Sequence, residues 1–458
     1  MHTFGEQPAV VSAGASSSQE PWYREMQPYH WFVLVVAALG WLFDCLDQQL
    51  FVLTRQPAMK ELIASANTSA IDKASTIATS IFLVGWASGG LIFGVLGDRI
   101  GRARTMIITI LMYSIFTGLS ALSQSFWDFA VYRFLTGLGV GGEFAVGVAL
   151  VAEVMPDRAR PFALALLQAL SAVGNITAAL LNMGMGALVE SGLVTNVWRP
   201  LYVVGAVPAL LALLIRRRLK EPERWQHAAQ HAAKRSELGS YRELFSHPRW
   251  RRHALLGLVM AFCGVVGLWA IGFYSMDLVG NVLSRRFEQE GFAQEQIAGR
   301  VAWWKGITSL MNNVGAFFGM YVFGMVTQRI GRRPAFAIAF LAAFASTVAV
   351  FALLREFWQI FVLVPIMGFC QLSLFAGYAV YFPELFPTRL RSTGTSFCYN
   401  VGRFVSALGP FLLGHLIVVF SGTPEPLRYA GLVMCAVFLI GLIVLPFVPE
   451  TKGRPLPE

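Results

Sequence analysis

The feature that most constrains this chain is its series of long apolar blocks. A helix needs about 20 predominantly apolar residues to cross the hydrocarbon layer of a bilayer. Charged residues make up only 14% of the 458 residues, whereas a soluble domain carries about 25%. The blocks therefore predict an all-α membrane protein with many spans, and the composition excludes a soluble domain of this size.

The apolar blocks form two sets of six, separated by a polar stretch. The predicted helices are 29–53, 74–97, 104–122, 126–152, 161–188 and 197–216, then 253–282, 300–326, 334–354, 357–382, 392–420 and 428–448. We expect bundles at 29–216 and 253–448, a linker at 217–252, and tails at 1–28 and 449–458. The N-terminal tail lacks the apolar stretch of a signal peptide.

The net charge of +10 is concentrated in short connections between the blocks. Arginines follow the second, fourth, eighth and tenth predicted helices: Arg99, Arg102, Arg104, Arg158, Arg160, Arg329, Arg332, Arg333, Arg389 and Arg391. Cytoplasmic loops are rich in Lys and Arg, so both termini are expected in the cytoplasm, across a bacterial inner membrane. The charge is thus interpreted as a topology signal, and no nucleic-acid partner is expected.

The five cysteines form no CxxC pair, and most lie inside apolar blocks. Neither a disulfide framework nor a metal site is expected from them, and no cofactor is expected.

Two loop motifs occur twice with nearly the same offset. GDRIGRAR follows the second predicted helix and TQRIGRRP follows the eighth, with Gly101 and Gly331 lying 230 residues apart. AEVMPDRAR follows the fourth helix and PELFPTRLR the tenth, with Glu153 and Glu384 lying 231 residues apart. Two motifs with one offset indicate two parallel six-helix halves, as in secondary transporters that bind solute near the midplane.

These motifs carry a resemblance to a known family. GVLGDRIGRARTM (94–106) resembles the loop signature of the major facilitator superfamily. LKEPERW (219–225) and PETKGRPLPE (449–458) are similar to elements of its sugar-porter-like members. The resemblance implies twelve helices in two pseudo-symmetric bundles, and transport by alternating access.

Acidic and basic residues recur at the cytoplasmic helix ends of both halves. The candidate gating network is Asp98, Arg102, Glu153, Arg158, Glu221, Glu223, Arg332, Glu384, Arg389, Arg391 and Glu450. Such groups can pair in one state and separate in another; the alternative is that they only set topology. Gln328 occupies the position in the second half that corresponds to Asp98 in the first, so we expect weaker pairing between the halves at Gln328.

Three acids lie at membrane depth, where a charge is costly and is a functional candidate by default. Asp44 and Asp47 are three residues apart, on one helical face. Glu143 lies in a glycine-rich helix that permits close backbone approach. We predict that these acids couple transport to protons; the alternative is a structural hydrogen-bonded pair.

The Asp-x-x-Asp pattern resembles that of aromatic-acid and other organic-acid proton symporters, although Cys45 follows the first Asp where those members usually have Gly. The Gly-Gly-Glu stretch resembles sialate and metabolite–proton symporters.

Two bases lie within predicted helices of the second half, Lys305 and Arg403. A deeply buried Arg needs an anionic partner, which is either one of the three acids or a substrate carboxylate held through two hydrogen bonds. Basic residues occur at comparable places in organic-anion transporters of the superfamily. The alternative for Lys305 is a side chain that extends to the outer interface. Polar and aromatic residues that could complete a site are Gln168, Asn175, Tyr274, Asn312, Tyr399 and Asn400.

The leading hypothesis is a monomeric, proton-coupled symporter of a small organic anion. A neutral-sugar symporter is the first alternative, because the loop motifs are sugar-porter-like. A drug–proton antiporter is the second, although the fifth helix lacks the Gly-Pro-rich motif usual in such exporters. No nucleophile with a histidine partner and no metal-ligand spacing is present, so an enzyme is not expected.

Overall fold

The computed structural model describes residues 21–64, 67–190, 193, 198–210, 218–231, 238–406 and 409–458. Within these residues the chain is almost entirely helical and contains no β-strand. The first half contains α1 (Pro28–Leu62), α2 (Thr68–Ile100), α3 (Arg102–Ser120), α4 (Phe126–Val154), α5 (Arg160–Glu190) and α6 (Trp198–Val204). The second contains α10 (Pro248–Val266), η3 (Gly267–Gly272), α11 (Phe273–Gln289), α12 (Gln294–Ile330), α13 (Arg332–Leu353), α14 (Phe357–Leu385), α15 (Arg391–Ser406), α16 (Gly409–Val419), α17 (Pro426–Met434) and α18 (Val437–Val444).

The predicted all-α fold with twelve spans is confirmed. Nine spans in the described part of the chain are long and apolar enough to cross a membrane without interruption, with α17 and α18 counted as one. The other three spans are α6, the run from α10 through the π-helical turn η3 to α11, and the pair α15–α16. Of the first, the helix Trp198–Val204 is described. Each half therefore contributes six spans.

Several helices extend beyond the predicted ends. The first helix continues to Leu62 instead of ending at residue 53, and α12 begins at Gln294 instead of residue 300. The linker also holds two short helices, α8 (Glu223–His231) and α9 (Tyr241–Ser246). Apolar runs mark only the part of a helix that lies in hydrocarbon, whereas backbone hydrogen bonding continues into polar sequence beyond it.

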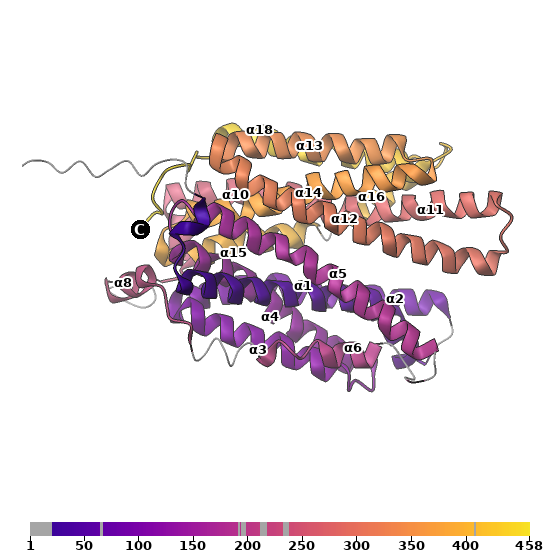
Figure 1. Cartoon of the computed structure of the whole chain (residues 1–458), viewed down its shortest axis with the longest axis horizontal. Coiled ribbons are helices and arrows are strands. Elements are labelled where there is room, and N and C mark those ends of the chain that lie inside the picture. The colour runs from indigo at the N-terminus through magenta and orange to yellow at the C-terminus, as the bar shows by residue number, and fades with distance from the viewer. Residues whose placement is uncertain are drawn as a thin grey trace, which may run out of the picture.

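The two halves lie side by side, with their long helices running in similar directions (Figure 1). Helices α1 to α6, drawn in indigo to magenta, occupy one side, and α10 to α18, drawn in pink to yellow, occupy the other. The halves meet chiefly along two helix pairs, α2 with α15 and α5 with α12. Helix α4 also contacts α15, so the predicted site residues of α4 and α15 lie near the interface between the halves, and α1 packs against α4 and α5 behind it.

Glycines allow very close packing inside each half. A Cβ atom on Gly141 of α4 would lie 1.9 Å from the carbonyl oxygen of Trp86, and one on Gly89 of α2 would lie 2.0 Å from that of Leu138. Gly319, 230 residues after Gly89, makes the same kind of contact between α12 and α14. Small residues let membrane helices approach closely where no hydrophobic effect drives them together. The sequence repeat therefore extends to the helix packing itself.

Replacing Gly141 with Ala should destabilise the first half, because the new methyl group would overlap the Trp86 carbonyl. Overpacking of this kind costs about 1–3 kcal/mol, and we expect a lower midpoint of thermal unfolding for Gly141→Ala in detergent. The matched control is Gly306→Ala in α12, where a Cβ would meet no atom within 4 Å. Equal midpoints for the two variants would contradict the packing account.

Candidate functional site

One end of the molecule, here named the Arg-rich end, carries the connections α2–α3, α4–α5, α12–α13 and α14–α15 together with α8 (Figure 1, left). At its centre Glu153 lies between two arginines, with Oε1 2.9 Å from Arg102 Nη2 and 2.8 Å from Arg391 Nη1. All three side chains are buried. Arg102 also pairs with Asp98 at 2.9 Å and donates to the Thr388 carbonyl at 2.7 Å. Because Arg391 and Thr388 belong to the second half, these bonds hold the two halves together at this end.

Asp98 makes a second link between the halves. Its carboxylate accepts hydrogen bonds from the backbone N–H groups of Ser392 (3.2 Å) and Thr393 (2.8 Å) and from the Thr393 hydroxyl (2.6 Å). These donors lie in the first turn of α15, where N–H groups lack partners within the helix and the dipole favours an anion. At the repeated position Gln328 donates one hydrogen bond, of 3.1 Å, to the Arg158 carbonyl across the halves. The second half thus makes fewer cross-half bonds at this position.

The second half repeats the intra-half ion pair. Arg332 donates to both oxygens of Glu384, at 3.0 and 2.6 Å, just as Arg102 donates to both oxygens of Glu153. The Thr451 hydroxyl completes the site on Glu384 at 2.5 Å. The repeated motifs therefore build equivalent charge clusters, but of the two glutamates Glu153 alone pairs with an arginine of the opposite half within the described residues.

Two glutamates cap equivalent helices. Glu221 accepts hydrogen bonds from the first N–H groups of α3, including that of Arg102 at 2.7 Å, and Glu450 accepts those of Arg332 and Arg333 in α13, both at 3.0 Å. Each cap lies against a glycine with positive φ, Gly101 or Gly331, where a Cβ would collide with the carboxylate. The sugar-porter-like elements after each half therefore act as helix caps.

The Glu450 carboxyl has a pKa below its ordinary value. Partial burial raises this pKa, but hydrogen bonds from four backbone N–H groups outweigh burial by stabilising the charged form. The folded protein thus keeps this cap ionised to lower pH than an unfolded chain would.

Three members of the predicted gating network differ from expectation. Arg389 pairs with Glu243 of α9 at 2.8 Å, and Arg158 with Glu25 of the N-terminal segment at 3.0 Å. Neither acid was predicted as a partner. Glu223 is exposed at the start of α8, with no ion pair among the described residues, and its membership in the network stays a prediction. A helix start favours an acid by its dipole alone, which explains Glu223 without a network.

Deeper in the first half, two of the predicted acids meet. Asp44 of α1 and Glu143 of α4 are almost completely buried, and their side chains contact each other. No described group donates a hydrogen bond to any of their four oxygens. Gly40 makes room for the pair, since a Cβ there would lie 2.3 Å from Glu143 Oε1. Two carboxylates in contact repel each other when both are charged, so this arrangement favours a proton on at least one of them.

Asp47 is in a different environment. It accepts a 2.8 Å hydrogen bond from the Thr117 hydroxyl and pairs with Arg133 at 3.4 Å, and it is completely buried. Arg133 also donates to Ser120 and stacks over the ring of Tyr202, 4.7 Å from its centroid. The sequence did not assign Arg133 to Asp47, because the two lie on helices 86 residues apart. A fully paired Asp47 is better suited to structure than to proton transfer.

Arg403 of α15 lies across the interface between the halves. Its guanidinium donates to Asn400 Oδ1 at 2.8 Å and lies over the rings of Trp86, at 4.3 Å, and Tyr399, at 5.2 Å. Trp86 belongs to α2 of the first half and was missed, because nothing in the sequence distinguishes it from a core residue. The alternative of direct pairing with Asp44 or Glu143 does not hold here, since no described group bonds to their carboxyl oxygens.

Aromatic rings continue from Arg403 toward the acids. The Tyr399 ring lies 4.6 Å from that of Phe144, which lies 4.3 Å from that of Trp41. The candidate site is thus an acid pair and a cation with a row of aromatic rings around them.

The other predicted solute-binding residues are distributed around this site. Gln168 is buried and its Oε1 has no partner among the described residues, and the same holds for the buried Oδ1 of Asn312. Asn175 bonds to Asn313 across the α5–α12 interface at 3.0 Å. Tyr274 is half-buried near the start of α11. Their roles remain predictions.

Lys305 lies apart from the acid pair. It is partly exposed and pairs with Asp277 of α11 at 3.4 Å, as expected for a side chain reaching toward an interface. The structure does not bring it to Arg403, and solute binding by Lys305 stays an untested prediction.

Comparison with known proteins identifies the family. The sequence profile of the Major Facilitator Superfamily matches residues 37–292 and 298–458. The chain belongs to this superfamily. It is therefore a multi-pass membrane transporter for small molecules and not an enzyme, as the loop motifs predicted.

Relatives and solved structures within the superfamily resemble the chain over most of its length. A probable 4-methylmuconolactone transporter from Cupriavidus pinatubonensis is 30% identical, covering 94% of this chain and 93% of its own. A cis,cis-muconate transport protein from Acinetobacter baylyi is 31% identical, covering 82% and 85%. A proton:xylose symporter of known structure shares the fold with a TM-score of 0.71 at 17% identity, covering 93% of this chain and 98% of its own.

Replacing Glu153 with Gln should loosen the Arg-rich end of this transporter. The change leaves two buried arginines facing a neutral amide, and breaking a buried ion pair costs about 3–5 kcal/mol. We expect faster backbone hydrogen exchange at residues 97–103 and 388–396, measured by mass spectrometry, than in the unmodified protein. The matched control is Glu61→Gln, whose partner Arg199 is partly exposed at the opposite end. Unchanged exchange at both segments would show that Glu153 does not hold the halves together.

Proposed function

We propose that this superfamily member is a proton-coupled symporter of a small organic anion. The observation that carries the proposal is the pairing of two features at the interface between the halves. The first half provides a buried carboxyl pair without donors, Asp44 and Glu143. The second half provides a buried guanidinium, Arg403, among aromatic rings. The carboxyl pair suits a proton, and the guanidinium suits a carboxylate.

Charge balance explains how the two solutes would act together. A buried guanidinium is stable when an anion neutralises it, and a buried carboxyl is stable when it is protonated. With Asp44 protonated in every state, an anion on Arg403 together with a proton on Glu143 leaves the interface close to neutral. Relative to that state, the anion alone adds one negative charge and the proton alone adds one positive charge at membrane depth. The loaded carrier can therefore reorient at lower cost than a half-loaded one.

Reorientation requires the Arg-rich end to open. In the present state Glu153 and Asp98 bind groups of the second half there. We infer that these bonds break in the opposite state, and that the intra-half pairs Arg102–Glu153 and Arg332–Glu384 persist. The structure thus corresponds to the state closed at the Arg-rich end.

The rings around Arg403 favour a solute with a flat, unsaturated body. Trp86 and Tyr399 flank the guanidinium, and Phe144 and Trp41 continue the aromatic wall. Relatives named for muconate and 4-methylmuconolactone transport point to the same class of carboxylate. A neutral sugar would use amides such as Gln168 and Asn312 and would leave Arg403 without a role in binding.

The Arg-rich end would face the cytoplasm of a bacterial cell by the positive-inside rule. The described termini, near η1 (Trp22–Glu25) and Glu458, lie at this end (Figure 1). The proposal includes a monomeric carrier in the inner membrane that uses no cofactor beyond the proton gradient.

Uptake into proteoliposomes tests the proposal. With an inward proton gradient we expect accumulation of cis,cis-muconate, benzoate or niacin, but not of xylose. Arg403→Gln should lower uptake roughly tenfold or more, since losing a charge-assisted bond costs at least about 1.4 kcal/mol. Glu143→Gln should abolish the response to the gradient while leaving solute exchange.

The matched control for Arg403→Gln is Arg285→Gln, which removes an exposed arginine paired with Glu425. This control should transport normally. Uptake of xylose in preference to every acid would favour the neutral-sugar alternative, and acid uptake that ignores both the gradient and Arg403 would overturn the proposal.

A further inference from the structure

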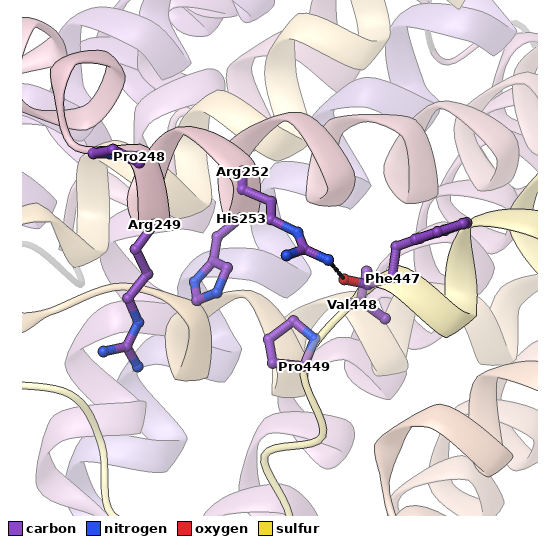
Figure 2. A pocket seen from close by; sticks show the side chains of 7 residues that line it. All are labelled: Pro248, Arg249, Arg252, His253, Phe447, Val448 and Pro449. Carbon is purple, nitrogen blue, oxygen red and sulfur yellow. Dashed lines mark hydrogen bonds between the residues drawn. The ribbon is translucent and has the colours of Figure 1, made fainter.

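A basic pocket lies at the Arg-rich end, apart from the transport site. Pro248, Arg249, Arg252 and His253 of α10 face Phe447, Val448 and Pro449 across a cavity of about 460 Å³. Figure 2 shows Arg249, Arg252 and His253 projecting from the same stretch of helix, with the Arg252 guanidinium reaching the carbonyl oxygen of Phe447. That hydrogen bond is 3.2 Å long and uses only one of the five guanidinium N–H groups.

No acid among the described residues balances the positive charge of this pocket. Neither Arg249 nor Arg252 makes an ion pair with an acid in the part of the chain that the structure describes. Arg249 lies over the buried Trp250 ring, 4.8 Å from its centroid. The pocket also lies at the start of α10, where His247 provides no side-chain cap for the first N–H groups. Guanidinium groups and helix N-termini both attract phosphate.

The pocket lies at the boundary between apolar and polar surface. Beyond His253, α10 continues as the apolar run Ala254–Val266. The opposite wall follows the apolar helix α18 and begins in the short 3-10 turn η5 (Leu445–Phe447). The side chain of Phe447 is 57% exposed on this wall. An occupant can therefore place an anionic group against the arginines and an apolar chain beside Phe447.

The fold itself does not require these arginines. The first helix of the other half begins at the equivalent place with Pro28, Tyr29 and His30 and carries no arginine there. The Tyr29 hydroxyl bonds instead to the backbone of Lys220. The arginine pair at the start of α10 is thus not repeated at the start of α1.

The geometry points to a binding site for the phosphate headgroup of an anionic phospholipid in this pocket. Arg249 and Arg252 hold the phosphate at the start of α10, and the acyl chains run along Phe447 and α18. Basic pockets beside membrane helices are known to hold such headgroups. The pocket lies between α10 and the segment that leads to the Glu450 cap. An occupant therefore holds these two parts of the second half together at the Arg-rich end.

Thermal unfolding of the full-length protein in detergent tests this inference. The probes are short-chain phosphatidylglycerol, short-chain phosphatidylcholine and inorganic phosphate, each at matched concentration. A ligand that binds only the folded state raises the unfolding midpoint. We expect phosphatidylglycerol to raise it by several degrees and the other two probes to have little effect. The double variant Arg249→Gln/Arg252→Gln should lose most of this shift.

The matched control is Arg251→Gln, an exposed arginine on the same turn that does not line the pocket, and it should keep the full shift. Bound lipid counted by native mass spectrometry provides a second readout if the double variant has a lower starting midpoint. Equal shifts with phosphatidylcholine, or an unchanged shift and lipid count in the double variant, would overturn the inference. An arginine-dependent shift with inorganic phosphate equal to that with lipid would also overturn it, in favour of a soluble anion.

Discussion

A single buried carboxylate, Glu153, bonds to an arginine in each half of this transporter. In hydrocarbon an unpaired charge is so costly that each buried group needs a partner. Arg102 belongs to the same half and can stay with Glu153 through the cycle, whereas Arg391 belongs to the other half. In the proposed cycle, opening the Arg-rich end requires Arg391 to leave Glu153 for water. On that proposal the closure of this end, and the side from which the candidate site is reached, depend on that exchange.

The two halves share packing and loop chemistry but differ in their charges. Gly89 and Gly319 allow equivalent helix contacts, and Glu221 and Glu450 cap equivalent helices. Inside the membrane, however, the first half holds the acids and the second holds Arg403. Repetition provides a symmetric scaffold that can rock between two states. The asymmetry within it gives the two proposed ligands, proton and anion, separate places.

The sequence predicted the fold and the charged clusters of the Arg-rich end, because the loop motifs of the two halves recur at one offset. It predicted partners poorly. The pairing of Arg133 with Asp47, or of Arg389 with Glu243, depends on how helices distant in sequence face one another. The helical spacing of Asp44 and Asp47 suggested one acid cluster. In the structure the two acids have different neighbours on α4, because Asp44 contacts Glu143 and Asp47 pairs with Arg133. Periodicity gives the face of a helix but not the identity of its neighbour.

Proton exchange on solute binding tests the central claim, that an anion on Arg403 and a proton on the Asp44–Glu143 pair occupy the carrier together. The measurement is the pH change of a weakly buffered solution of purified protein when an accepted carboxylate such as cis,cis-muconate is added. The account predicts proton uptake that saturates with the carboxylate and is lost in Glu143→Gln, although that variant still binds the solute. Solute binding without proton uptake, or equal proton uptake in Glu143→Gln, would contradict it.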